Sequence, residues 1–245
     1  MGEVIAVLSG KGGTGKTSVC AGIATALAES EKRVLCIDCD IGLRNLDISL
    51  GISEQAALSF LDISEGSYTF DQAAVHPAYP SLQFLTAPMT RSAYQVDANA
   101  FASMLRSARK RYDYILLDAP AGVDAGFRLA AKSADRCVLV TGPDPAAIRD
   151  AERTADVLEL MGKRHTRLVV NRVVPKMVST MDLTIDDVMD RAGLPLLGLV
   201  PEDVDVTLAA GFGRPLLKQT RKGAAAACRR IARRIQGYPE PINIR

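Results

Sequence analysis

Short apolar runs alternate with longer helical patterns along this chain. Six runs consist of consecutive, mostly apolar residues, at 4–8, 34–37, 114–117, 137–140, 168–170 and 196–200. Continuous runs of this length are typical of strands that are buried on both faces of a parallel sheet. Helical patterns lie between them at about 16–29, 98–110, 145–161 and 183–191. The alternation predicts an α/β fold, doubly wound, with a mostly parallel sheet and helices on both faces.

The organisation of the chain predicts a single domain. The sequence contains no linker rich in Ser, Gly or Pro and no internal repeat. Residues 82–85 are a weaker candidate for a further strand. We expect one domain over residues 1–237, followed by a short extended tail over 238–245 that contains Pro239 and Pro241.

The distribution of charge along the chain is more informative than its overall composition. The chain has 245 residues, a hydrophobic fraction of 48%, a charged fraction of 24% and a net charge of +2, which is too small to indicate a nucleic-acid partner. From Lys218 onward, however, there are eight basic residues and a single acid, Glu240. This basic end indicates either a local anionic partner or a solvated helix face.

The cysteines and the apolar runs indicate a cytoplasmic location. The five cysteines show no disulfide-rich spacing, which is typical of a reducing compartment. Cys36 and Cys39 lie in or beside a predicted strand, where residues three apart point to opposite faces, so we expect buried structural cysteines and no shared metal. No run approaches the roughly 20 apolar residues of a membrane span, and the first apolar run leads into a glycine loop instead of a signal-peptide pattern.

The strongest chemical motif is Gly-Lys-Gly-Gly-Thr-Gly-Lys-Thr at residues 10–17. It follows a predicted strand, opens a predicted helix and fits the phosphate-binding pattern G-x-x-x-x-G-K-[ST]. Glycines let the backbone wrap phosphates, and the helix N-terminus adds positive potential. Lys16 is expected on the β- and γ-phosphates and Thr17 on Mg²⁺. The residues expected to contact nucleotide here are Gly10, Lys11, Gly12, Gly13, Thr14, Gly15, Lys16, Thr17 and Ser18.

Lys11 is a second lysine inside this loop. At the mouth of the loop it is poorly placed for its own phosphates. We expect it to reach the nucleotide of a facing subunit and to neutralise charge there, as an arginine finger does.

Acidic residues follow two of the predicted strands. Asp118 ends the run at 114–117, which is the position of a metal-supporting carboxylate in phosphate-binding sites. Asp38 and Asp40 follow the run at 34–37, and Asp40 opens a polar stretch, residues 40–47, that suits a switch loop. Asp40 is therefore the candidate for orienting the attacking water.

These segments resemble the deviant Walker A ATPases of the MinD/ParA group. The resemblance rests on residues 11–17, on Ile-Gly-Leu-Arg-Asn-Leu-Asp at 41–47 as switch I, and on Asp-Ala-Pro-Ala-Gly at 118–122 as switch II. Switch I is more similar to the MinD branch than to the ParA branch. Residues 178–187 and 198–203 continue the resemblance, which covers about residues 2–236.

The resemblance implies an ATP hydrolase that dimerises around ATP and Mg²⁺. It implies catalytic roles for Lys11, Lys16 and Asp40, metal contacts from Thr17, Asp40 and Asp118, and close approach of the subunits at Gly12. It also implies adenine contacts from Asn171, Arg172, Pro201 and Asp203; an amide such as that of Asn171 offers both a donor and an acceptor to adenine.

The implied partners are a homodimer partner, a division inhibitor of the MinC type and a MinE-type topological regulator, in the placement of the division septum. Members of the MinD branch typically end in a basic amphipathic helix that binds the membrane. Nothing after Gly237 has that pattern, so direct membrane binding does not follow, and peripheral association with the inner face of the membrane stays open.

The last predicted helix, residues 223–236, carries Arg229, Arg230, Arg233 and Arg234 on one side and small apolar residues on the other. We expect its apolar side to pack on the domain and its arginine face to be exposed. An exposed arginine face favours one alternative, a ParA-like ATPase that binds DNA non-specifically. A nucleotide-gated scaffold with negligible turnover is a second alternative, against which the intact Asp40 argues.

Overall fold

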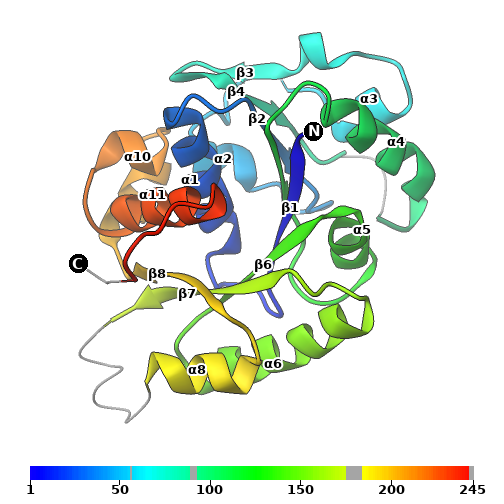
Figure 1. Ribbon diagram of the computed structural model, residues 1–245. Helices are drawn as coiled ribbons and strands as arrows, with labels where there is room; N and C mark the ends of the chain where they lie inside the picture. Colours follow the sequence, from blue (N-terminus) through cyan, green and yellow to red (C-terminus); the bar gives the residue numbers. More distant parts are fainter. Residues whose placement is uncertain (56, 89–92, 175–183, 243–245) are drawn as a thin grey trace.

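A single twisted sheet of eight strands forms the centre of the computed structural model, which describes residues 1–55, 57–88, 93–174 and 184–242 (Figure 1). The strand order is β3-β4-β2-β5-β1-β6-β7-β8, and every pair except β3–β4 is parallel. The strands are β1 (Glu3–Leu8), β2 (Val34–Asp38), β3 (Ala74–His76), β4 (Tyr79–Leu85), β5 (Tyr114–Asp118), β6 (Arg136–Thr141), β7 (Thr166–Val173) and β8 (Leu196–Pro201).

Helices cover both faces of this sheet (Figure 1). They are α1 (Lys16–Glu29), α2 (Leu46–Leu50), α3 (Phe60–Ser64), α4 (Ala98–Ala108), α5 (Ala125–Ser133), α6 (Pro145–Leu160), α8 (Ile185–Ala192), α9 (Val204–Gly211), α10 (Leu216–Gln219) and α11 (Gly223–Ile235), with 3-10 turns at Phe70–Gln72 and Ala93–Gln95. Alternate residues of β1 enter two separate apolar clusters, one with α4, α5, α6 and α8 and one with α1 and α11. The predicted doubly wound fold is confirmed.

The predicted elements are present, with small shifts at their ends. All six predicted strands form, and the weaker candidate at 82–85 is part of β4. The helix predicted at 183–191 begins at Ile185 among the described residues; 175–183, which include part of the segment 178–187, lie outside them. The antiparallel strand β3 and the helices α5 and α9 were not predicted, because each is too short to show a clear period.

Helix α1 is held against α11 by very close packing. Gly22 faces Cys228, and a Cβ atom at Gly22 would lie 2.4 Å from the Cys228 Sγ atom. The two helices therefore meet almost backbone to side chain, which explains the small residues on the buried side of α11. The predicted packing of α11 on the domain is thus confirmed.

The expectation of an exposed arginine face on α11 is wrong. Of its four arginines only Arg233 is exposed, and the other three are half-buried. Arg229 donates to the Glu29 carboxylate of α1 at 2.5 Å and to the Leu217 carbonyl at 3.3 Å. The helix lies deep enough between α1 and β8 for neighbouring elements to cover the stems of these long side chains.

The two cysteines of the C-x-x-C pattern are both buried and lie on opposite sides of the sheet. Cys36 belongs to the cluster under α1, where its Sγ atom lies 4.0 Å from that of Cys20, and Cys39 belongs to the other cluster. Across the described part of the chain, no helix combines the length and apolar character needed to cross a bilayer.

Candidate nucleotide site

The loop between β1 and α1 lies where the parallel strands end, the edge at which doubly wound sheets bind ligands. Gly13 and Gly15 have φ angles of 82° and 80°, in the left-handed region that favours glycine. A Cβ atom at Gly10 would lie 2.4 Å from the Thr154 hydroxyl, so Gly10 lets α6 pack against the loop. A Cβ atom at Gly12 would meet nothing within 4 Å, so this face of the loop is open.

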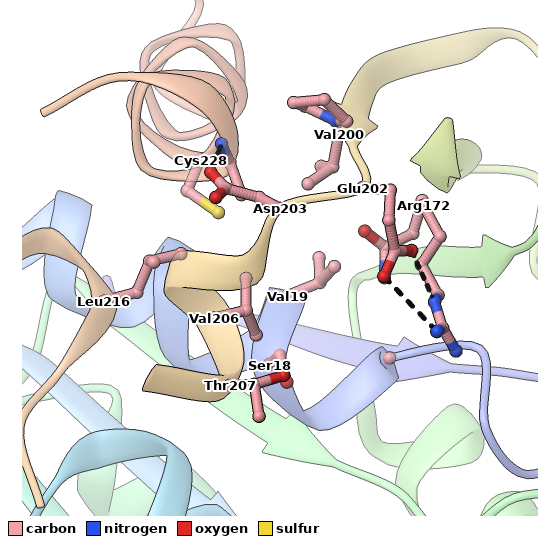
Figure 2. A pocket seen from close by; sticks show the side chains of 14 residues that line it. Ser18, Val19, Arg172, Val200, Glu202, Asp203, Val206, Thr207, Leu216 and Cys228 are labelled. Atoms are coloured by element: carbon pink, nitrogen blue, oxygen red, sulfur yellow. Dashed lines mark hydrogen bonds and ion pairs between the residues drawn. The ribbon is translucent and has the colours of Figure 1, made fainter. Parts of the chain in front are cut away.

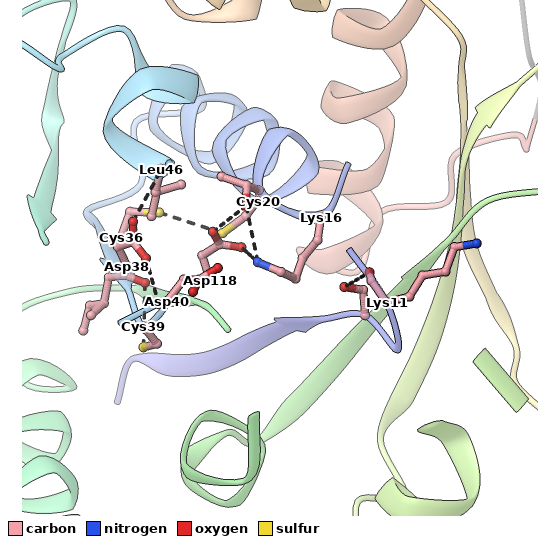
Figure 3. Close-up of polar contacts among 12 residues, drawn as sticks. Lys11, Lys16, Cys20, Cys36, Asp38, Cys39, Asp40, Leu46 and Asp118 are labelled. Atoms are coloured by element: carbon pink, nitrogen blue, oxygen red, sulfur yellow. Dashed lines mark hydrogen bonds and ion pairs between the residues drawn. The ribbon is translucent and has the colours of Figure 1, made fainter. Parts of the chain in front are cut away.

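Lys16, Thr17 and Asp118 form a compact polar cluster at the base of the loop, and Figure 3 shows Lys16 pointing toward Asp118. Lys16 Nζ donates to Asp118 Oδ1 at 2.5 Å, and Thr17 Oγ1 donates to Asp118 Oδ2 at 2.8 Å. Both Lys16 and Asp118 are buried. Burial lowers the pKa of Lys16, but the charge and hydrogen bond of Asp118 outweigh it and raise the pKa overall, so the ammonium group stays charged. Burial also raises the pKa of Asp118, against the effect of Lys16 and Thr17.

Asp38 holds the start of the predicted switch loop. Its carboxylate accepts the backbone N–H groups of Asp40 at 2.8 Å and of Leu46 at 3.3 Å. Burial raises the pKa of Asp38 to about 7, with a further contribution from the charge of Asp118 in the neighbouring strand. The loop that carries Asp40 is therefore fixed at both ends to a buried carboxyl, while Asp40 itself is half-buried.

Lys11 points away from this cluster (Figure 3). Its Nζ atom lies 3.6 Å from the Asp144 carboxylate, and its side chain is 39% exposed. Asp144 is also the N-cap of α6, where it accepts the N–H of Ala147 at 2.9 Å and is followed by Pro145 at the first helical position. Sequence reasoning missed Asp144, because its partner Lys11 is distant along the chain.

A cavity of about 220 Å³ opens beside the loop (Figure 2). It contains the predicted residues Gly15, Ser18, Asn171, Arg172, Pro201 and Asp203. The sequence missed the rest of its wall, which consists of Val19, Val200, Glu202, Val206, Thr207, Leu216, Ala224 and Cys228. These residues come from α1, β8, α9, α10 and α11, and only the tertiary structure brings them together. The mixture of apolar walls and a few polar groups is typical of a site for a flat heterocycle.

Two of the predicted adenine residues make structural contacts in this arrangement. Asn171 Nδ2 donates to the Thr14 carbonyl at 2.8 Å, so this amide supports the phosphate loop. Asp203 accepts the backbone N–H groups of Asp205 at 3.0 Å and Ala224 at 2.8 Å, and thereby caps α9 and the start of α11. Each side chain lines the cavity while one or more of its polar atoms is already engaged.

Arg172 adopts a left-handed backbone conformation, with a φ of 61°. Its guanidinium group bonds the Glu202 carboxylate at 2.7 Å and the Gly13 carbonyl at 3.2 Å. A non-glycine residue with this conformation costs free energy and is retained where the surroundings fix it. Here it ties the end of β7 to both the phosphate loop and the residue after β8.

The residues present fit a nucleoside triphosphate with magnesium. Thr14 Oγ1 is buried without a hydrogen-bond partner in the described part of the chain. Glycines with positive φ aim backbone N–H groups into the open loop, and a charged lysine and a threonine hydroxyl stand at the start of α1. Such donors suit phosphate oxygens, and the Thr17 hydroxyl with the Asp118 carboxylate suits Mg²⁺.

The fold and this site define a nucleotide-binding protein of the P-loop class. Residues 5–216 match the family model described as CobQ/CobB/MinD/ParA nucleotide binding domain. The septum site-determining protein MinD of Bacillus subtilis (strain 168) is 36% identical over 248 residues, covering 100% of this chain and 92% of the relative. The chain belongs to the CobQ/CobB/MinD/ParA nucleotide-binding family, and it is a P-loop ATPase that is similar to MinD proteins.

Solved structures agree with this assignment. One chain of the MinC:MinD cell division protein complex of Aquifex aeolicus superposes with a TM-score of 0.90 at 35% identity, covering 98% of each chain. The septum site-determining protein MinD of Pyrococcus horikoshii OT3, complexed with Mg-ADP, superposes with a TM-score of 0.83 at 27% identity, covering 96% of each chain. The resemblance stated from the sequence is therefore confirmed.

Proposed function

We propose that this chain is an ATP- and Mg²⁺-dependent dimerising switch that regulates placement of the division septum by recruiting an inhibitor partner of the MinC type. The names and folds of its relatives support this proposal, including a MinC:MinD complex and a MinD with Mg-ADP. The observation that carries it is the arrangement of the two loop lysines. Lys16 lies inside the site on Asp118, whereas Lys11 leaves it, with 39% of its side chain exposed.

Lys16, Thr17 and Asp118 are proposed to form the reacting centre. When bound, Mg²⁺ and ATP supply the metal and the phosphoryl group to be hydrolysed. Lys16 would bind phosphate oxygens in place of Asp118, and the Thr17 hydroxyl and the Asp118 carboxylate would hold the metal. Asp40 orients water from the loop that Asp38 fixes. Gly10 through Ser18 supply the cradle, and Asn171, Arg172, Pro201 and Asp203 form the adenine side.

Lys11 is proposed to act across a dimer. Its only ion-pair partner among the described residues is Asp144, at 3.6 Å, and an exposed pair of this kind is worth little free energy. Moving Lys11 from Asp144 to the phosphates of a facing subunit therefore costs little free energy. Gly12 has no side chain, which leaves room for the second subunit to approach closely. The second subunit would complete each site and make dimerisation depend on ATP.

The recruiting surface is proposed to lie at the switch segments, residues 40–47 and 122–128. Leu43 in the first segment is 71% exposed, which is unusual for a leucine beside a ligand site. Loss of the γ-phosphate would relax these segments and release the partner. A MinE-type regulator is proposed as the activator of hydrolysis, and residues 1–237 are proposed to act as one domain.

The alternative of non-specific DNA binding is less well supported than it was from the sequence. Three of the four arginines of α11 are half-buried, and Arg229 is engaged by Glu29. Few free cations therefore face outward from this helix to contact phosphates. The scaffold alternative requires a defective switch, yet Asp40 is in place with its backbone N–H fixed by Asp38.

The test compares Lys11→Ala with Lys110→Ala, a matched loss of an exposed lysine far from the site. Dimerisation is measured by light scattering with ATP and with ADP, and hydrolysis by phosphate release. We expect Lys11→Ala to retain nucleotide binding, to stay monomeric with ATP and to lose about 100-fold or more in turnover, because charge-neutralising groups of this kind contribute at least that much. Lys110→Ala should behave like the parent protein.

Lys16→Ala and Asp40→Ala separate binding from chemistry. Lys16→Ala should lose nucleotide binding, whereas Asp40→Ala should bind ATP and accumulate as the dimer, because hydrolysis is slowed. A MinC-type protein of the same organism should co-elute with the Asp40→Ala dimer in ATP and not in ADP. If Lys11→Ala dimerises and hydrolyses ATP like the parent, the cross-subunit role is wrong.

A further inference from the structure

A second polar cavity lies between the last turn of α11, the start of β7 and the chain that follows α11. After α11 the chain turns back toward β8 (Figure 1). The cavity has a volume of about 620 Å³ and is lined by Arg167, Arg234, Tyr238, Glu240 and the two neighbouring prolines. Arg167 is the second residue of β7, whereas the nucleotide site lies beyond the opposite ends of the strands. This cavity is therefore separate from the phosphate loop.

Arg234 carries a buried nitrogen without a partner. Its Nη1 atom is inaccessible to solvent and makes no hydrogen bond in the part of the chain that the structure describes. Burial and the nearby charge of Arg167 both lower the pKa of Arg234, so the two guanidinium groups lie close enough to repel each other. Over the same described ranges, neither Arg167 nor Arg234 forms an ion pair.

The nearby acids are already taken by other arginines. Glu240, which also lines the cavity, pairs with Arg233. Glu3 pairs with Arg136, and that arginine also donates to the Ile235 carbonyl at the end of α11 at 3.0 Å. The charges of these two acids are neutralised by their arginine partners. Arg167 and Arg234 therefore leave an excess of positive charge at the cavity.

A guanidinium nitrogen that is buried without a partner, such as Arg234 Nη1 beside the positive charge of Arg167, destabilises the fold unless an anion is bound. An unsatisfied charged donor loses its hydration without replacement, and the charge of Arg167 adds repulsion between like charges. Guanidinium groups match the oxygens of phosphate in a two-pronged geometry. We propose that this cavity binds a phosphate-type oxyanion between Arg167 and Arg234.

The oxyanion has two possible sources with the same chemistry, a free phosphate ion or the phosphate of a lipid headgroup. The cavity is open to solvent at the exposed side chain of Arg167, so either can reach it. In the first case the stability of the fold depends on the concentration of free phosphate. In the second case it gives the domain its own contact with a membrane surface, without an amphipathic helix.

The first arm of the test uses protein saturated with Mg-ADP, so that nucleotide occupies the phosphate loop. Inorganic phosphate is titrated at constant ionic strength, with chloride as the control ion, and binding is followed by calorimetry. We expect Arg234→Gln and Arg167→Gln to weaken phosphate binding by about tenfold or more, because each removes a charge-assisted contact. Arg106→Gln, which removes an exposed charge on α4, should leave it unchanged.

The second arm uses sedimentation with vesicles of phosphatidylglycerol and of phosphatidylcholine, again with Mg-ADP. If the source is a lipid headgroup, the parent and Arg106→Gln pellet with the anionic vesicles and the two cavity variants do not. If the source is a free ion, calorimetry detects phosphate and no protein pellets. Both outcomes support the site and distinguish its ligand.

A stability measurement keeps the proposal independent of binding strength. Without phosphate, Arg234→Met should raise the melting temperature, because the substitution removes the unpartnered Nη1 atom and the repulsion from Arg167. Phosphate should raise the melting temperature of the parent and not that of the variant. If the cavity variants match Arg106→Gln in both binding arms, the proposal is wrong.

Discussion

The stability of the nucleotide-free protein should fall as the pH rises from 4 to 8, and Asp38 should be a main cause. Burial and the neighbouring Asp118 raise the pKa of the Asp38 carboxyl from 3.8 to about 7. Between these two values the folded protein binds a proton that the unfolded chain releases. The free energy of unfolding therefore falls with rising pH across this window and levels off above about pH 7.

The size of the effect follows from the shift. A shift of about three pKa units corresponds to about 4 kcal/mol between pH 4 and pH 8, since one unit is worth about 1.4 kcal/mol. Asp38→Asn removes this dependence, because an amide does not ionise. Its amide oxygen can still accept one of the two N–H groups, from Asp40 or Leu46, and the lost second bond costs about 1 kcal/mol at all pH values.

Urea unfolding at a series of pH values measures the effect, with equal m-values confirming that the two proteins unfold alike. The stability of the parent minus that of Asp38→Asn should change by about 4 kcal/mol across the window, and Asp38→Asn should be the more stable protein at pH 8. Asp156→Asn, at an exposed position on α6, should run parallel to the parent. Parallel curves for Asp38→Asn would refute the argument that this carboxyl is neutral in the folded protein below pH 7.

Two glycine substitutions test close contacts that the structure defines. Gly15→Ala should abolish measurable nucleotide binding in calorimetry while the fold survives, because φ is 80° there and the new Cβ atom would lie 2.2 Å from Asn171 Nδ2; unchanged affinity would contradict the loop geometry. Gly22→Ala should lower the free energy of unfolding by about 1–3 kcal/mol, because its Cβ atom would press on Cys228 Sγ at 2.4 Å between α1 and α11. Cys228→Ala should restore most of that loss, which a double-mutant cycle measures.

Local patterns were sufficient for most of the fold. Continuous apolar runs produce buried parallel strands wherever they occur, so residues 4–8 and 114–117 indicated their own environment. The helix at 16–29 was predicted with correct ends, because the glycine loop precedes it and its alanine-rich run favours a helix. In contrast, β3 depends on pairing with β4, and α5 lies in a segment where the switch motif hid a helical pattern of only nine residues.

The predicted exposure of charged side chains was less reliable than the predicted elements. The arginines of α11 lie on one side of the helix, as the sequence indicates, but their exposure depends on how deeply the helix sits between α1 and β8. Glu29, which engages Arg229, is 200 residues away along the chain. The periodicity of one helix cannot predict such a contact, because it contains no information on which other elements pack against that helix.

By itself the sequence determined the fold class and the phosphate-loop motif, and it pointed to Lys16, Thr17, Asp40 and Asp118 as candidate site residues, because each depends on residue type over a few positions. Only the tertiary structure decided what lies around them. It placed Asp38 under the switch loop, built the cavity beside the loop from six elements, and left Arg234 Nη1 without a partner next to Arg167. The physical reason is that burial and charge pairing depend on distances between segments far apart in the chain, and these distances exist only once the sheet and its helices have packed.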